Sequence, residues 1–359
     1  MIRIIDKYFL KRYITTFSIT TFAFLVIFII VNIVENMSTF LDRQAALGSI
    51  YKYYVLSIPT FLVWVMPISM LMSSLFTMGS YVKYGELTAL KSAGISLYRV
   101  ILPVLLFALL ISVFAFWFGE IIATENEREK NILWSSEIKK NIQNFRYSQN
   151  KLVFQDSETR HVSIEHYNGN DKRGINVEIT EQRENRIVSL ISAKTIVPDG
   201  DDWILKDVKI RDFSTGKEEV TELKEHKITD FSFNESDLIS FQIKPETMNY
   251  KELDEFIEKL KRNGNPYQDW LVDYYSKFAF PFANFIVVLL GLPLATRNWR
   301  GGITVSFGIG LFICFSYYVV MTIMNTFGYN EILPPHLAAW GSNILFVLLG
   351  AVILVFSKK

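Results

Sequence analysis

A single lysine inside a long apolar stretch is the first residue whose position suggests chemistry. Lys277 lies between Asp273 and Pro281 in the stretch Leu271–Ala295. A charged side chain at membrane depth is costly and is by default a functional hypothesis. Its ammonium group could contact an anionic substrate. It could equally reach the membrane surface and pair with Asp273, which lies at helical i,i+4 spacing. The spacing leaves both interpretations open.

Two more polar residues lie at the C-terminal end of the first apolar stretch, Tyr13–Val34. Asn32 and Glu35 could line the same substrate cavity as Lys277, or they could mark the membrane interface. The pattern favours the interface.

Sequence patterns of catalytic and nucleotide-binding centres are missing. The nearest approach to a Walker A motif, "FSTGKEE", lacks the upstream glycine and the Ser or Thr that should follow Lys217. No G-x-S-x-G elbow of the serine hydrolases occurs. We therefore expect that the chain is not an enzyme and does not bind ATP by this route.

Metal-binding patterns are also missing. The four histidines are scattered, and His161 and His166 would point to opposite faces of a strand. The single cysteine, Cys314, lies in an apolar run and reads as a small buried hydrophobe. We expect neither a metal site nor an intrachain disulfide.

Long apolar helices must position these residues. Half of the 359 residues are hydrophobic, and 29 of them are Phe, 17 Tyr and 7 Trp. The net charge of +1 argues against a nucleic-acid partner. About 20 apolar residues cross a bilayer as a helix. Six stretches meet this length: Tyr13–Val34, Tyr53–Met78, Val100–Ile122, Leu271–Ala295, Ile303–Phe327 and Leu337–Phe356.

Basic residues in the short loops indicate the orientation of these spans. After the first stretch, "ENMSTFLDRQAALGS" holds only Arg43, and the loop before the last stretch holds no Lys or Arg. The opposite loops and both termini are basic: Arg3, Lys7, Lys11, Arg12, Lys83, Lys91, Arg99, Arg297, Arg300, Lys358 and Lys359. Both termini are therefore expected in the cytoplasm, and the segment between the third and fourth stretches is expected to be exported.

Residues 123–265 have the pattern of an antiparallel β-domain. Alternating segments such as "GINVEIT" and "DDWILKDVKIRDF" are separated by polar turns. This predicts a small β-sandwich or a jelly-roll-like sheet. Its edge could accept a strand from a partner, or the domain could merely cap the membrane part. Shared faces are expected for Ile175, Val177 and Ile179 in one strand, and for Ile204, Val208 and Ile210 in another.

A short helix is expected between this domain and the fourth stretch. Asn249 and Glu252 match a capping box, and Gly264 suits a C-terminal stop. The helix should lie along the membrane surface, because a narrow apolar stripe runs along it: Leu253, Phe256, Ile257 and Leu260.

Proline and small residues mark special positions in the fourth and fifth stretches. Pro281 and Pro293 should kink the fourth stretch at either end. Ser306 and Gly310 form a small-xxx-small pair in the fifth, which predicts a helix contact within the chain or with a partner.

The loop "YGELTALKSAGIS" predicts one more short helix between the second and third stretches. Gly94 ends it, and its small-residue face is formed by Glu86, Ala89, Leu90 and Ala93. From the pattern alone, a plain loop helix at the membrane interface remains an alternative to a docking element.

The order of these elements resembles the LptF/LptG (YjgP/YjgQ) family of lipopolysaccharide export permeases. The resemblance covers essentially the whole chain and lies in "IDKYFLKRYITT", "YGELTALKSAGISLYRV", "MNYKELDEFIEKLKRNG" and "KFAFPFANFIVVLLGLPLAT". The last two blocks look closer to the LptG branch. The resemblance implies an α-helical membrane protein with six transmembrane helices (3+3) and an inserted periplasmic antiparallel, jelly-roll-like β-domain. The expected parts are residues 1–122 with a coupling helix at about 85–94, residues 123–265, and residues 266–359.

The resemblance also implies a function in the inner membrane of a Gram-negative bacterium. Family members are permease subunits of an ABC transporter that extracts lipopolysaccharide and passes it to a periplasmic β-jelly-roll bridge. Implied partners are an LptF-like second permease subunit, an LptB-like ATPase dimer that binds the ATP and Mg²⁺, and a bitopic LptC-like protein. Spans one and five would line the cavity and its gates. The chain itself would bind no cofactor.

Candidate site residues follow from the same resemblance. Those expected to contact the ATPase are Glu86, Leu87, Ala89, Leu90, Ala93 and Gly94. Lys277 matches a basic position near the outer end of span four, which favours a phosphate contact. Enteric LptG proteins have a lysine where this chain has Asn32. Either the substrate differs in its phosphorylation, or Lys277 and residues such as Arg128 or Lys130 take over the contact of that lysine.

Three alternative functions are weighed against this one. A membrane scaffold could anchor a periplasmic bridge without moving lipid. A different lipid or lipoprotein export permease, of the MacB type, would carry its exported domain after the first span, and the 3+3 arrangement counts against it. A polytopic enzyme is disfavoured by the missing catalytic residues.

Overall fold

A computed structural model gives the fold of two compact units. The first contains Met1–Ser38, Tyr51–Arg128 and Gln268–Lys359, and the second contains Thr39–Ile50 and Glu129–Tyr267. The structure describes residues 4–138, 148–157, 159–168, 172–183, 186–200, 202–213, 218–229, 231, 245–262, 266–296 and 302–356.

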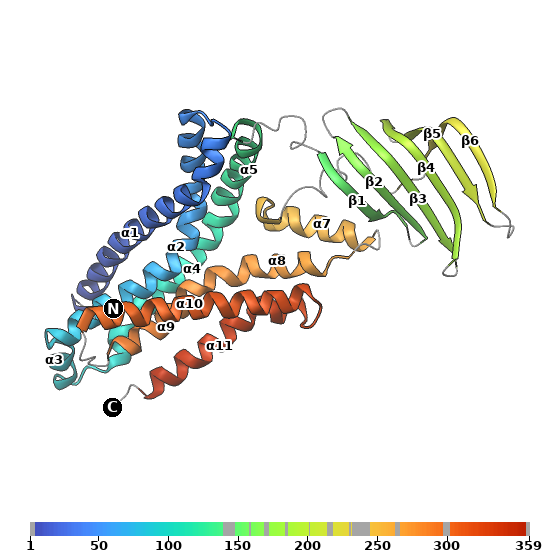
Figure 1. Ribbon diagram of the computed structural model, residues 1–359. Coiled ribbons are helices and arrows are strands. Elements are labelled where there is room, and N and C mark those ends of the chain that lie inside the picture. The colour runs from blue at the N-terminus through green and yellow to red at the C-terminus, as the bar shows by residue number, and fades with distance from the viewer. Residues whose placement is uncertain are drawn as a thin grey trace. The chain divides into compact units, whose positions relative to one another are not determined.

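Six spans in the described chain are long and apolar enough to cross a membrane, which confirms the six-span prediction. Two of them are interrupted: the third by π-helical turns and the fourth by a 3₁₀ turn. The spans are formed by α1 (Ile4–Asp42); α2 (Leu47–Lys83); α4 (Leu97–Phe118), η1 (Gly119–Ala123), α5 (Thr124–Leu133) and η2 (Trp134–Ile138); α8 (Gln268–Ala279), η4 (Phe280–Phe282) and α9 (Ala283–Ala295); α10 (Gly302–Tyr329); and α11 (Pro335–Phe356) (Figure 1).

Helices α2 and α9 form the centre of the helical unit. We compare the most apolar 18-residue segment of each span. In the fourth span, which contains α9, 67% of these residues are buried, and in α2 56% are buried. In α1 and α10 only 6% and 17% are buried. Gly291 lets α9 approach α2, because a Cβ at this position would lie 2.5 Å from Leu71 Cδ1. Gly310 of α10 likewise faces Leu75 of α2, and a Cβ there would lie 2.6 Å from Leu75 Cδ1. Gly310 therefore lies at a contact within the chain, whereas the side chain of Ser306 falls outside the described set.

The fourth span breaks at Pro281, as the sequence predicted. Proline has no backbone N–H, and the 3₁₀ turn η4 separates α8 from α9. Next to the break, the carbonyl of Ala279 accepts a hydrogen bond of 2.8 Å from the side-chain amide of Asn343 in α11. Pro293 lies in the last turn of α9, so no separate second break is formed there.

The second unit contains a six-stranded antiparallel sheet, which confirms the predicted β-domain. Each strand pairs with its neighbours in the chain, so the strand order follows the sequence (Figure 1). The strands are β1 (Ser148–Gln155), β2 (Arg160–Asn168), β3 (Arg173–Arg183), β4 (Arg186–Asp199), β5 (Asp202–Asp212) and β6 (Glu219–Ile228).

An irregular line crosses this sheet at Asn176 in β3 and Asp207 in β5 and reverses which residues point to its core, although the strand register is the same on both sides of it. In β3, Val177 and Ile179 are buried but Ile175 is 41% exposed, so the prediction of one shared face is wrong for Ile175. The reason is Asn176, whose φ of 53° puts two successive residues on the outer face. Asp207 has the same φ in β5.

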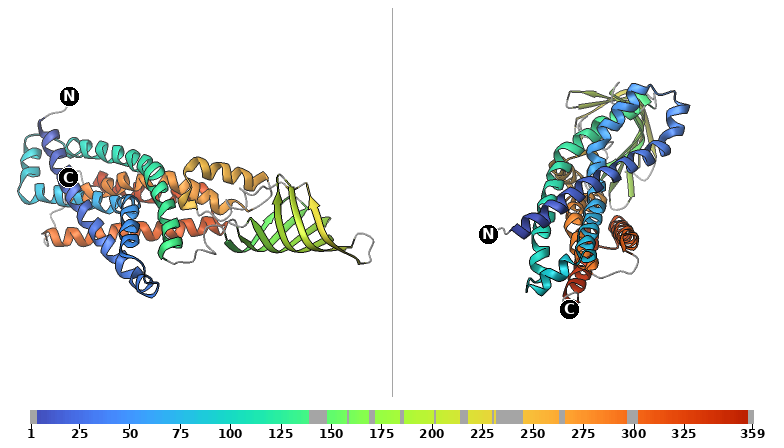
Figure 2. Two further views of the ribbon diagram at one scale, coloured as in Figure 1. Left: turned by 90° about the horizontal axis from the view of Figure 1, so that it is seen from above. Right: turned by 90° about the vertical axis from the view of Figure 1, so that its left-hand side faces the viewer.

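The positive φ of Asp207 in β5 also corrects the second predicted face. Trp203 and Leu205 point to the core on one side of it, and Val208 points to the core on the other. Ile204 therefore does not share a face with Val208. Asn176 and Asp207 lie at one level of the sheet, and the strands curve round an apolar inner surface (Figure 2).

The helix α7 (Tyr250–Arg262) begins with the predicted capping box. Asn249 Oδ1 accepts a hydrogen bond from the Glu252 N–H at 3.0 Å, and Glu252 Oε2 accepts one from the Asn249 N–H at 2.9 Å. Its apolar stripe is buried, and Gly264 lies outside the described residues. A short helix α3 (Glu86–Ser92) also forms in the loop between α2 and α4.

Candidate functional site

Helix α3 is a seven-residue helix with a glycine turn at each end (Figure 1). Gly85 and Gly94 have φ values of 74° and 75°, a left-handed conformation that favours glycine. Helices this short are unstable alone in water. The surroundings must therefore hold α3 in place.

Leu87 fastens α3 to the helical core. Its side chain is 4% exposed and belongs to the buried cluster that also contains Phe9, Tyr81 and Leu97. Leu87 is one of the residues predicted to contact the ATPase, but its burial makes it an anchor of α3 and not part of the outer surface. Leu90 is partly buried against the same cluster. The exposed members of the predicted set are Ala89, Ala93 and Gly94.

The Glu86 carboxylate forms an ion pair with Arg12 of α1. The Nη1–Oε1 distance is 3.4 Å, and the two side chains are each about one third exposed. The guanidinium carbon of Arg12 lies 4.9 Å from the centre of the Tyr81 ring. Sequence reasoning missed this partner because the two residues are separated by 74 positions, and no spacing rule relates them.

Lys277 has a partner that the sequence did not indicate. Its Nζ lies 3.1 Å from Oε1 of Glu120, and the two side chains are only 14% and 10% exposed. Glu120 belongs to the π-helical turn η1, and such turns are frequent at functional sites. Asp273, the partner considered from spacing, accepts a hydrogen bond of 2.6 Å from the Tyr329 hydroxyl.

The other predicted cavity residues lie on α1 and α5. Asn32 accepts hydrogen bonds from the Asn36 amide at 2.8 and 3.1 Å, and Glu35 is exposed. Arg128 pairs with Glu125 at 3.6 Å, and Lys130 is partly buried. The described contacts thus join Lys277, Asn32 and Arg128 each to a residue outside the predicted set.

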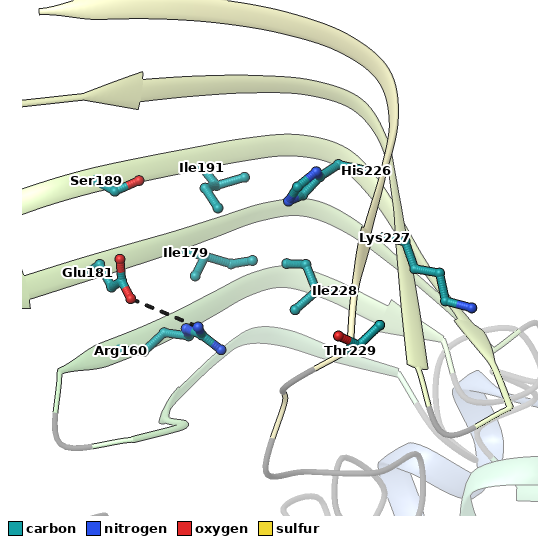
Figure 3. A pocket seen from close by; sticks show the side chains of 9 residues that line it. All are labelled: Arg160, Ile179, Glu181, Ser189, Ile191, His226, Lys227, Ile228 and Thr229. Atoms are coloured by element: carbon teal, nitrogen blue, oxygen red, sulfur yellow. Dashed lines mark ion pairs between the residues drawn. The ribbon is translucent and has the colours of Figure 1, made fainter.

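A small pocket of about 170 Å³ lies at the mouth of the curved sheet (Figure 3). Ile179, Ile191 and Ile228 point into it beside His226, and Arg160 pairs with Glu181 at its rim at 3.9 Å. Lys227 lies at the same rim, and its hydrogen bonds to Asp199 and Asp202 raise its pKa. Over the residues that the structure describes, no group of three or more His, Cys, Asp or Glu side chains could hold a metal ion.

Comparison with known proteins gives one family. The chain matches the family described as lipopolysaccharide export system permease LptF/LptG over residues 7–355. This range includes the six spans and the sheet. The match is to LptF and LptG jointly, so the closer resemblance to LptG stays a prediction. No curated protein matches the chain.

Proposed function

Because the chain belongs to the LptF/LptG family of lipopolysaccharide export permeases, we propose that it is the membrane subunit of an ABC transporter for lipopolysaccharide. In this proposal the chain takes the lipid from the bacterial inner membrane and passes it to a periplasmic bridge. Both termini lie in the cytoplasm, and the sheet lies in the periplasm. The observation that carries the proposal is the match over residues 7–355 of a chain with six spans and one inserted sheet.

Helix α3 is the proposed docking element for a separate, LptB-like ATPase. Its outer surface is small and accessible at Ala89 and Ala93, so a partner can approach the backbone closely. The Glu86 carboxylate retains exposed surface beside these residues. Leu87 ties the helix to the core that includes α2 and α9. A displacement of α3 by the ATPase would therefore be transmitted to the centre of the helical unit.

The low burial of α1 and α10 supports a second permease subunit and a lipid cavity. In their most apolar 18-residue segments, only 6% of the residues of α1 and 17% of those of α10 are buried by the rest of the chain. Apolar spans that pack little within their own chain leave their faces to lipid or to other helices. We propose that α1 and α10 line the substrate cavity together with an LptF-like subunit, and that an LptC-like helix lies beside α1.

The ion pair of Lys277 with Glu120 restricts how this lysine can contact a phosphate group of the lipid. Glu120 already compensates the lysine charge at 3.1 Å. A phosphate group of the lipid would have to displace that carboxylate or share the lysine ammonium group with it. Phosphate offers several strong acceptor oxygens, so a shared ammonium group is the arrangement we propose.

The sheet offers two edge strands for a periplasmic bridge. β1 and β6 lie at the ends of the strand order, and an unpaired strand edge is a template for pairing with another chain. We propose that one of these edges joins the jelly-roll of the next protein in the bridge.

Reconstitution separates this function from a static scaffold. The purified complex in proteoliposomes should release lipopolysaccharide to a soluble β-jelly-roll acceptor with ATP, and not with ADP. Release that is independent of ATP, or no release with an active ATPase present, would contradict the transporter proposal. Mass spectrometry of the co-purified subunits and lipid identifies the partners in the same preparation.

A further inference from the structure

The start of α1 holds the coupling helix α3 from two sides. Arg12 forms its ion pair with Glu86, the first residue of α3, at 3.4 Å. Asp6 forms a second ion pair with Arg99, in the first turn of α4, at 3.3 Å. The segment that contains α3 is therefore linked to the same helical end both where it begins and after it ends.

An aromatic stack fixes the Arg12 side chain. Its guanidinium group lies over the ring of Tyr81, the last buried residue of α2. Tyr81 stacks on Phe9 with ring centres 4.2 Å apart and an interplanar angle of 14°. Both aromatic residues are 1% exposed. A guanidinium held on a buried ring is restricted in orientation, so Arg12 presents its charge to Glu86 from a defined position.

Helix α3 needs such restriction, because its other attachments allow it to turn. Leu87 is its one fully buried residue, Leu90 is partly buried against the same cluster, and apolar contacts fix position better than rotation. Gly85 and Gly94 flank the helix, and no atom lies within 4 Å of where a Cβ would be at either residue. A helix held by two apolar side chains between two open glycine turns can pivot unless the ion pairs Arg12–Glu86 and Asp6–Arg99 oppose it.

We infer that the first two turns of α1 belong to the coupling element itself, with Arg12 as the positioning residue of the Glu86 carboxylate. The Asp6–Arg99 pair completes the clamp, so α3 and α1 move as one body. This inference rests on the proposed docking of an ATPase at α3. Arg12 contacts Oε1 of Glu86, and a carboxylate has acceptor sites on both oxygens, so Arg12 and a donor of the ATPase can share it.

The mechanical consequence concerns α1. It is the least buried span, with 6% of its most apolar window covered by the chain. Packing therefore opposes a displacement of α1 less than it opposes a displacement of α2 or α9. A movement that enters at α3 would pass through Arg12 and Asp6 into α1 directly.

Charge variants test the clamp with two separate measurements on the complete complex. One is the amount of ATPase retained during affinity purification, and the other is the lipopolysaccharide released per ATP hydrolysed in proteoliposomes. Arg12→Gln should keep ATPase retention and lower the release ratio by about two- to fivefold, the range of a surface ion pair. Arg12→Lys should give a release ratio between those of Arg12→Gln and the unaltered complex. Asp6→Arg should lower it, and Asp6→Arg with Arg99→Asp should restore it.

The same experiment distinguishes failure of the clamp from failure of the docking proposal. An unchanged release ratio in Arg12→Gln, or no rescue by the swapped Asp6 and Arg99 pair, would overturn the clamp. Loss of ATPase retention in Arg12→Gln would make Arg12 a docking residue and overturn its positioning role. The docking proposal is judged by Glu86→Arg alone, through ATPase retention.

A cross-link tests the movement as one body. In a Cys314→Ala background, Asp6→Cys with Arg99→Cys lacks the ion pair and should show the lowered release ratio. Joining the two cysteines with a short bis-maleimide should restore it, because the covalent link replaces the lost contact. If the cross-link blocks release or leaves the ratio low, α1 and the start of α4 must separate during transport, and the clamp is wrong.

Discussion

The side chain of Asn343 in α11 donates a hydrogen bond to the backbone of the broken fourth span. Its amide donates a hydrogen bond of 2.8 Å to the Ala279 carbonyl, and its own Oδ1 accepts one of 2.6 Å from the Tyr317 hydroxyl of α10. Polar groups at a helix break inside a bilayer have no water to bond and need partners from the protein. Three spans therefore meet at the break beside Pro281, and the break is a fixed part of the fold.

Replacing Asn343 should destabilise the helical unit. Asn343→Leu removes both buried hydrogen bonds of this amide, to the Ala279 carbonyl and from the Tyr317 hydroxyl, a loss of about 1–3 kcal/mol. Tyr317→Phe keeps the amide–carbonyl bond and should lose only about 0.6 kcal/mol, a typical value inside membranes. Denaturant titration of the purified chain in micelles measures both. Equal losses would show that the Ala279 contact is not the dominant one.

Reversing the charge of Glu86 should release the ATPase. Glu86→Arg places like charge where the docking proposal needs a carboxylate, and we expect more than about a tenfold drop in retained ATPase. Lys91→Glu is the matched control, because it is an equal charge reversal about 140° around the same helix. Retention that is unchanged in Glu86→Arg, or lost equally in Lys91→Glu, would refute specific docking through Glu86.

The Lys277–Glu120 pair should show strong coupling in stability. Removing one partner leaves the other charge poorly compensated in a largely buried site, so Lys277→Met and Glu120→Gln should each cost about 3 kcal/mol. The double variant should recover most of that loss. Thermal unfolding of all four proteins in micelles gives the coupling energy, and additive losses would show that the pair is not a unit.

Lipid binding of the same variants tests the phosphate contact separately. If Lys277 is shared with a lipid phosphate, Glu120→Gln should bind lipopolysaccharide at least as tightly as the unaltered chain, because the competing carboxylate is gone. Lys277→Met should weaken binding to lipopolysaccharide more than to its dephosphorylated form. Equal weakening for both lipids would assign Lys277 to structure alone.

Features that depend on neighbouring residues could be predicted from the sequence. The six spans follow from local apolar composition, and the Asn249 capping box follows from residues three positions apart. The contacts of the candidate site are different in kind. Arg12 and Glu86 are 74 positions apart, and Glu120 and Lys277 are 157 apart, so only the packing of whole helices brings each pair together. Alternation in β3 failed at Ile175 because one residue, Asn176, leaves the extended conformation.

Adding a methyl group at Gly310 should disturb the contact of α10 with α2. A Cβ there would lie 2.6 Å from Leu75 Cδ1 and 2.8 Å from Met72 Cε. Overpacking of this kind costs about 1–3 kcal/mol, reduced to the extent that those flexible side chains can move. Gly308→Ala is the control on the same helix, since nothing lies within 4 Å of its added Cβ. Equal unfolding free energies for the two variants would contradict the close contact.

Valine at position 176 should weaken the sheet although valine is a favourable strand residue. The backbone of Asn176 has a φ of 53°, and a left-handed conformation costs an L-residue about 1–2 kcal/mol, with β-branched residues the least tolerant. Asn176→Val also removes the hydrogen bond of 2.6 Å from the Asn176 amide to Glu165. Asn176→Gly loses that bond but keeps the conformation, so it should cost less than valine.

Lys194→Val provides the control at the same level of the sheet. Lys194 lies on β4 between residues that pair with β3, it is exposed, and it is not among the residues with positive φ. Strand propensity alone predicts that both valine substitutions stabilise the sheet. The left-handed conformation of Asn176 predicts opposite outcomes: faster amide hydrogen exchange in β2 and β3 for Asn176→Val, and unchanged or slower exchange for Lys194→Val. Slower exchange in both variants would show that the conformation of Asn176 does not oppose a β-branched residue.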